Sequence, residues 1–205
     1  MEQKITIPKI EPDDTKQELI ERGVELLELK NNAAALEFFN KALEKDPSDV
    51  KALVDKGIVL ARQGHYKDAR ALFDKAIEIS ESKGDVSFKA VANAGIVLSI
   101  FGDPNEAIKY FDRVLDNEEK VKQETLLAVL TNKGVTLLQQ GKYEESLPYF
   151  DRVLEIEPDR IGGLVNKANA LQELNRTDEA FPLFIKAHQL TKEPLSWKPT
   201  FIIIK

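Results

Sequence analysis

The chain contains no cysteine, and that absence removes several kinds of chemistry at once. It excludes disulfides, thiolate nucleophiles and metal sites built from sulfur. A cysteine-free composition suits a reducing compartment, and we expect a cytoplasmic location. Histidine is nearly as scarce, because the two copies, His65 and His188, are more than a hundred residues apart. We expect each of them on the surface.

Long apolar runs are also missing. No stretch approaches the roughly 20 apolar residues that cross a bilayer, and residues 1–8 hold no apolar segment of signal-peptide length. We therefore expect neither membrane insertion nor export. The net charge of −6 opposes broad binding to nucleic acids or to anionic membranes, which need a basic surface.

Motifs that would identify an enzyme are absent. Gly162-Gly163 lacks the Lys-Ser/Thr that completes a phosphate-binding loop, and no serine or lysine lies in a motif that activates a nucleophile. Carboxylates such as Asp49 and Asp159 precede predicted helices, where capping is the expected role. The sequence thus predicts no catalytic residue, no metal site and no cofactor.

Internal repetition is what the sequence has in abundance. Five phenylalanines each follow a small residue four positions upstream, and a second row of small residues, the glycine row, precedes each of them. The phenylalanines are Phe39, Phe73, Phe111, Phe150 and Phe184, and the glycine row is Gly23, Gly57, Gly95, Gly134 and Ala168. The spacings along the glycine row are 34, 38, 39 and 34 residues, which is the range of solenoid repeats.

Each repeat reads as two helices joined by a tight turn. Apolar residues recur at helical spacing on both sides of turns such as 64–66 and 141–143. A glycine inside a helix costs about 1 kcal/mol relative to alanine. We expect the glycine row to let the two helices of a repeat approach closely, opposite the row of small residues Ala35, Ala69, Ala107, Ser146 and Ala180. The phenylalanines should then fill the core between repeats.

These rows resemble the tetratricopeptide repeat, whose motif places a small residue in the first helix and then alanine, an aromatic residue, alanine and proline in and after the second. Ala35, Phe39, Ala42 and Pro47 match it fully, and the other copies match it in part. The family's usual tryptophan and tyrosine in the first helix are replaced by aliphatic residues. The resemblance covers residues 16–194 and implies an all-α, right-handed α-solenoid of five antiparallel helix pairs.

The predicted organisation is an extended segment at 1–15, the repeat array at 16–194 and an apolar, non-helical tail at 195–205. The two long spacings place extra residues near 82–87 and 116–125. We expect the second stretch to lengthen helices so that the array stays one domain; the alternative is a linker that splits the array in two. The five repeats are predicted at 16–49, 50–83, 88–121, 127–160 and 161–194.

Asparagines recur on the first helices of three successive repeats, at Asn93, Asn132 and Asn166, with Asp55 in the repeat before. In this family the first helices line a concave groove, and asparagines at this place resemble those that hold peptide backbones by hydrogen bonds. The alternative is that they bond only to neighbouring helices or water. The predicted peptide-binding residues are Asn93, Asn132, Asn166, Asn169, Lys51, Lys89, Ile58, Ile96 and Val135.

The sequence therefore predicts a non-catalytic adaptor that binds a segment of a protein partner in its groove. It does not favour the carboxylate clamp for heat-shock chaperone tails, because Ile20 and Val24 stand where that clamp needs lysine and asparagine. The alternative is a self-associating structural module, such as a homodimer, whose groove or open end is filled by residues 195–205 of its own or a sister chain.

Overall fold

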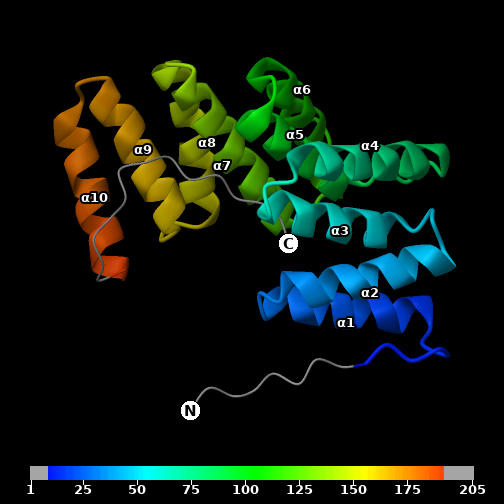
Figure 1. The fold of residues 1–205 in the computed structure, drawn as a ribbon. Coiled ribbons are helices and arrows are strands. Elements are labelled where there is room, and N and C mark those ends of the chain that lie inside the picture. The colour runs from blue at the N-terminus through cyan, green and yellow to red at the C-terminus, as the bar shows by residue number, and fades with distance from the viewer. Residues whose placement is uncertain (1–8, 192–205) are drawn as a thin grey trace, which may run out of the picture. The chain divides into compact units, whose positions relative to one another are not determined.

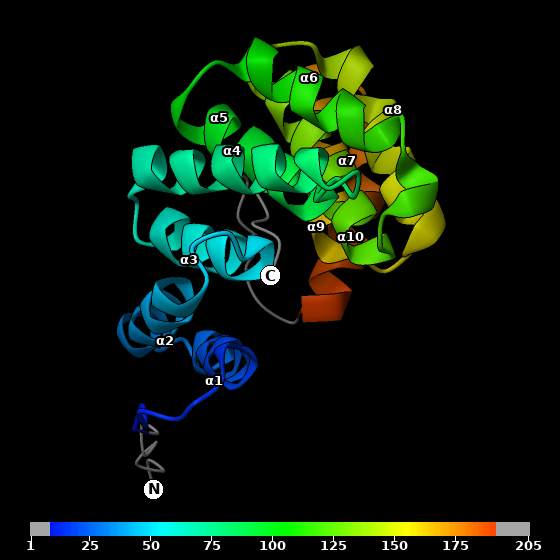
Figure 2. The same cartoon turned by 90° about the vertical axis from the view of Figure 1, so that its right-hand side faces the viewer.

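The computed structural model describes residues 9–191, which form ten α-helices and one short 3₁₀ helix (Figures 1 and 2). The helices pair in chain order, so the all-α fold of antiparallel helix pairs is confirmed. The tail predicted at 195–205 lies outside the described residues. The elements are α1 (Lys16–Glu28), α2 (Asn32–Lys45), α3 (Val50–Arg62), α4 (Tyr66–Ser82), α5 (Phe88–Phe101), α6 (Pro104–Leu115), η1 (Glu118–Lys120), α7 (Gln123–Gln139), α8 (Tyr143–Ile156), α9 (Ile161–Glu173) and α10 (Thr177–Thr191).

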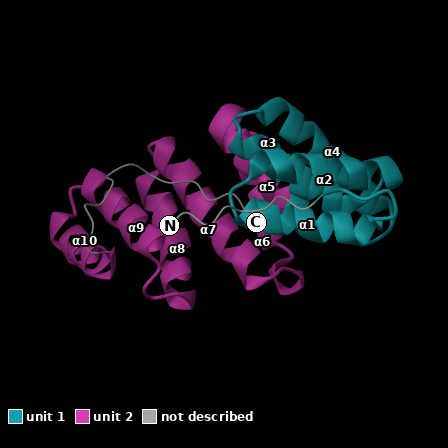
Figure 3. Ribbon diagram, turned by 60° about the horizontal axis from the view of Figure 1, so that its bottom comes forward, with its two compact units in different colours: residues 1–90, 205 teal, residues 91–204 magenta. Residues whose placement is uncertain are grey.

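Contacts between Cα atoms divide the chain into two compact units (Figure 3). Unit 1 contains residues 1–90, where α1 packs on α2, α2 on α3 and α3 on α4. In Figure 2 these four helices follow one another in space as they do in the chain. Unit 2 contains residues 91–204, where α6 packs on α7, α7 on α8, α8 on α9 and α9 on α10.

Left-handed backbone conformations close the turns inside several helix pairs. Gly64 and Gly141 have φ values of 83° and 75°, which cost glycine little because it has no Cβ. At the equivalent turns of the first and last pairs, Lys30 and Asn175 adopt φ values of 60° and 58°. The turns predicted at 64–66 and 141–143 are therefore confirmed.

Inside the first four pairs, a glycine of one helix lies against a phenylalanine ring of the other. A Cβ on Gly57 would lie 2.6 Å from Cε1 of Phe73, closer than real Cβ contacts come. The same holds for Gly23 with Phe39, Gly95 with Phe111 and Gly134 with Phe150, and all four rings are fully buried. The glycines thus lie against the phenylalanine ring of the other helix, whereas the sequence predicted the row of small residues opposite them. The rings also fill the core within a pair and not only between pairs.

The fifth pair departs from this pattern. Ala168 stands in place of the glycine, and the ring of Phe184 is only half-buried, whereas the four earlier rings have no exposure. The methyl group of an alanine takes up space that the glycines leave to the ring. The last described pair is therefore closed less completely than the others.

The two long spacings form different connections. After α4, residues 83–87 connect to α5 without helical structure. In the second long connection, α7 begins at Gln123, four residues before the predicted start of the fourth repeat at 127. The remaining extra residues form η1 and a short link. The predicted helix lengthening is thus right for α7 and wrong for the residues before it.

Ion pairs join successive repeats of unit 2. Lys133 of α7 donates a hydrogen bond to Asp112 of α6 and lies 4.5 Å from the ring centroid of Tyr149. Lys167 of α9 pairs with Asp151 of α8 at 2.6 Å. Burial alone would lower the pKa of Lys133, but the bonds with Asp112 and Tyr149 outweigh it and raise that pKa. Lys133 therefore remains charged although its side chain is only 8% exposed.

We predict that Gly57→Ala lowers the free energy of unfolding by about 1–3 kcal/mol, because the added methyl group overlaps the Phe73 ring. This loss would occur although alanine favours helices by about 1 kcal/mol. Gly162→Ala is the matched control, since nothing lies within 4 Å of its Cβ position, and it should stabilise by about 0.4–1 kcal/mol. Urea denaturation followed by circular dichroism measures both. A stabilising effect at Gly57 would contradict the packing argument.

We also predict that Asp112→Asn lowers the free energy of unfolding by about 1–3 kcal/mol, because it leaves the ammonium of Lys133 without its counter-ion. The matched change Asp151→Asn should cost less than about 1 kcal/mol, since the side chain of Lys167 is 27% exposed and water can solvate it. The same denaturation experiment compares the two. Equal losses would mean that burial of the lysine does not decide the cost.

Candidate functional site

The predicted binding residues all lie on the first helices of repeats. Lys51 and Ile58 belong to α3, and Lys89, near the start of α5, also falls in unit 1. The remaining six belong to unit 2: Asn93 and Ile96 on α5, Asn132 and Val135 on α7, and Asn166 and Asn169 on α9. Each unit therefore contains one candidate site.

The asparagine row of unit 2, which we define as Asn93, Asn132 and Asn166, is buried throughout. The exposed fractions are 1%, 0% and 1%. The Nδ2 of Asn132 donates to the carbonyl oxygen of Ala128 at 2.8 Å, a bond within its own helix. Part of the hydrogen-bonding capacity of this row thus serves α7 itself.

Two amides on α9 behave differently. The Nδ2 atoms of Asn166 and Asn169 are both buried, and neither has a hydrogen-bond partner. The two residues are three positions apart, so their side chains lie on one face of the helix. A buried donor without an acceptor costs about 1–3 kcal/mol. A bound group that supplies acceptors would remove this cost.

The apolar residues predicted to form pockets are buried in the core. Ile58, Ile96 and Val135 have no exposed surface. Val135 belongs to a core cluster with Leu138, Leu147, Phe150, Ala168, Ala170, Leu171 and Ala180. In this structure the three residues contribute to packing, and their contact with a ligand stays a prediction.

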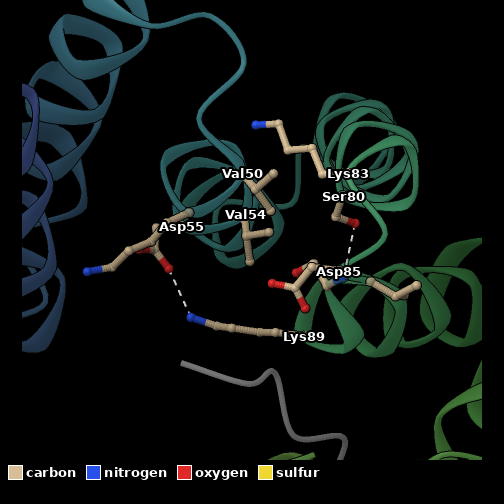
Figure 4. Close-up of a pocket in the computed structure, with 10 residues that line it drawn as sticks. Val50, Val54, Asp55, Ser80, Lys83, Asp85 and Lys89 are labelled. Atoms are coloured by element: carbon tan, nitrogen blue, oxygen red, sulfur yellow. Dashed lines mark hydrogen bonds and ion pairs between the residues drawn. The ribbon is translucent and has the colours of Figure 1, made fainter. Parts of the chain in front are cut away.

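Unit 1 contains a cavity of about 420 Å³ (Figure 4). We call it the unit-1 cavity. It is lined by the first half of α3, the end of α4, Lys83, residues 85–87 and Lys89. Val50 and Val54 supply apolar surface, and Lys51 and Lys83 supply ammonium groups.

An ion pair lies at one side of the unit-1 cavity. Lys89 Nζ donates to Asp55 Oδ1 at 2.9 Å, while Oδ2 of the same carboxylate is buried without a partner. The sequence placed Lys51 and Lys89 at a binding site but missed Lys83 and Asp85, which also line the cavity. The 38-residue spacing was the signal that could have found them, since they belong to the extra residues.

The chemistry available at both sites is that of binding. Amides, ammonium groups and a carboxylate oxygen lie beside aliphatic side chains, which suits hydrogen bonding and charge recognition. Among residues 9–191 no three metal-ligating side chains gather closely enough to hold an ion. Within the same residues no helix is both long and apolar enough to cross a membrane.

Comparison with known proteins identifies curated relatives along part of the chain. A TPR repeat-containing protein of Methanocaldococcus jannaschii is 29% identical over 99 residues, which cover 47% of this chain and 31% of that protein. Tetratricopeptide repeat protein 36 of Xenopus tropicalis is 29% identical over 112 residues, which cover 54% of this chain and 55% of that protein. The chain thus spans only about a third to a half of the curated relatives it matches.

Solved structures with the same fold cover more of the chain. YrrB, described as a TPR protein with an unusual peptide-binding site, has a TM-score of 0.62 and 23% identity over 86% of each chain. The type IV pilus biogenesis factor PilW has a TM-score of 0.78 and 19% identity over 88% of this chain and 79% of its own. A MamA double mutant has a TM-score of 0.69 and 18% identity over 87% of this chain and 96% of its own. At these identities the likeness shows the fold alone.

Family models agree with this fold along most of the described chain. Three models, each of the tetratricopeptide repeat, match residues 20–83, 89–159 and 137–183. These ranges contain nearly all of the residues in the helix pairs, together with the glycine row and the first four phenylalanines. The chain therefore belongs to the tetratricopeptide repeat family, whose fold is associated with protein–protein interaction.

Proposed function

We propose that the chain is a non-catalytic adaptor that binds an extended segment of a partner protein along the first helices of its repeats. The observation that carries this proposal is the pair of buried, unpartnered amide nitrogens on Asn166 and Asn169. Asn93 and Asn132 place further amides on the first helices of the two preceding repeats. The fold supports the proposal too, since YrrB, with the same fold, is described as having a peptide-binding site.

The spacing of the two amides on α9 suits an extended peptide. Side chains three positions apart on a helix have Cβ atoms about 5–6 Å apart. Carbonyl groups on one side of an extended strand recur every second residue, or about every 6.5–7 Å. Asn166 and Asn169 can thus donate to alternate carbonyls of one segment. Because backbone carbonyls are common to all residues, this contact would hold a segment largely regardless of its side chains.

We predict that Asn166→Ala combined with Asn169→Ala weakens peptide binding by about 1–3 kcal/mol for each donor that bonds to the peptide. In the free protein the same change should be neutral or stabilising, because it removes two buried donors that have no acceptor. The measurement is isothermal titration of a 12-residue peptide selected from a displayed library against the full chain, with urea denaturation of both proteins.

Asn40→Ala is the control, since Asn40 is an exposed amide on α2. It should change neither affinity nor stability by more than about 0.5 kcal/mol. Unchanged affinity in the double variant would remove the amides from the binding site. A large loss of stability would show that their role is structural.

A second candidate function, self-association, is favoured by the outer face of α10. Phe181 and Ile185 lie one turn apart there and are 63% and 42% exposed. One repeat earlier, Leu147 takes the place of Phe181 and packs in the core cluster that includes Ala168 and Leu171 of α9. Phe181 thus occupies a position that the next helix covers in the repeat before. A second copy of the chain would bury this apolar surface.

If the outer face of α10 is the contact between two copies, we predict that the full chain forms a homodimer. Phe181→Ser combined with Ile185→Ser should then convert it to a monomer. Light scattering coupled to size-exclusion chromatography measures the mass. Leu29→Ser is the control, because Leu29 is an exposed apolar residue too, at 52%, but belongs to the first repeat and not to α10. A wild-type chain that is monomeric at high concentration would exclude this candidate and leave the adaptor unaffected.

A further inference from the structure

The unit-1 cavity depends on the extra residues between the second and third repeats. The glycine row advances 38 residues here, against 34 for the preceding step. Ser87 N–H donates to Ser80 Oγ at 2.9 Å, which fastens residues 83–87 to the end of α4. Gly84 takes a φ of 71° within this connection. The connection and the first half of α3 enclose the cavity between them.

Asp55 shows what one part of a ligand must offer. Its side chain is only 4% exposed, and Oδ1 is occupied by Lys89. Oδ2 is buried and has no partner, so it lacks the hydrogen bond that a buried carboxylate oxygen normally has. A ligand that enters beside Asp55 and presents an N–H group would supply this bond.

The charges of the unit-1 cavity show what another part of the ligand must offer. Three lysines and two aspartates line it, so its formal charge is +1 in a chain whose net charge is −6. Lys51 and Lys83 form no ion pair within the described part of the chain. In Figure 4, Lys83 and Lys89 lie on opposite sides of Val54. A negative group on the ligand would neutralise the cavity, whereas a positive group would add to its excess charge.

An acidic residue inside a peptide meets both requirements, since it carries a backbone N–H group and a carboxylate a few bonds apart. We propose that the unit-1 cavity binds an aspartate or glutamate of the partner's segment, with its N–H toward Asp55 Oδ2 and its carboxylate between Lys51 and Lys83. The aliphatic part of that residue would lie on Val50 and Val54. This inference rests on the proposed adaptor function, and it gives that function a preference for acidic segments.

The test uses three labelled dodecapeptides of the repeat Val-Xaa-Ser, in which Xaa is glutamate, glutamine or lysine. Fluorescence anisotropy with the full chain at about 0.1 M salt gives their affinities, where exposed charges beyond about 10 Å are largely screened. The glutamate peptide should bind most tightly. Lys51→Glu and Lys83→Glu should each weaken it about tenfold.

Lys75→Glu is the matched control, because it makes the same change of charge on α4 without lining the cavity. It should lower the affinity for the glutamate peptide by less than about threefold at this salt concentration. Lys83→Glu should also improve binding of the lysine peptide, because the reversed charge then attracts it. This exchange of preference is specific to a charge that touches the ligand.

Three results would overturn the inference: a glutamate peptide that binds no better than the glutamine peptide, a preference for lysine, or an equal effect of Lys75→Glu. The adaptor function fails separately. If Asn166→Ala with Asn169→Ala weakens all three peptides alike while the lysine variants change nothing, the adaptor stands and the acidic preference falls. If the 12-residue peptide selected from the displayed library binds and the glutamate peptide does not, the adaptor function again stands and the acidic preference falls.

Discussion

Contact between a glycine and a phenylalanine ring sets the separation of the two helices in the first four pairs, and the other features depend on that separation. Without a Cβ, the helix backbone lies directly against the ring, as Gly134 does against Phe150. Each buried ring contributes about 1.5–3 kcal/mol. The candidate amides are tied to this contact by position, because Asn93 and Asn132 each precede a glycine of the row by two residues. In these two repeats the amide therefore lies on the same helix as the glycine that meets the ring.

The sequence predicted the helix pairs and their turns because both depend on local patterns that recur. Helical spacing shows which face of a helix is apolar, but not which side chain it meets. Gly57 was expected opposite small residues and instead meets Phe73, since that contact depends on how two helices rotate against each other. Burial was equally hard to predict. Ile96 and Val135 lie on the expected helices, yet they have no exposed surface.

The two candidate sites differ in how much of each could be predicted from the sequence. Recurrence along the chain indicated Asn166, but that its amide nitrogen is buried without a partner follows only from three-dimensional packing. The unit-1 cavity needed more. A long spacing indicated extra residues near 82–87, yet the cavity also requires the bond from Ser87 to Ser80 and the pair between Lys89 and Asp55. These contacts join residues 7 and 34 positions apart, which no local pattern records.

The alanine at position 168 has a consequence for the order in which the helix pairs of the array unfold. In a repeat protein, stability is close to a sum of terms for each pair and for contacts between neighbours. The pair α9 and α10 has a half-buried ring, so its own term should be the weakest. Backbone amides of α10 should then exchange with solvent early, through local fraying that spares the earlier pairs. A partner held by Asn169 would bind next to this frayed end and close it, so that recognition and local order would rise and fall together.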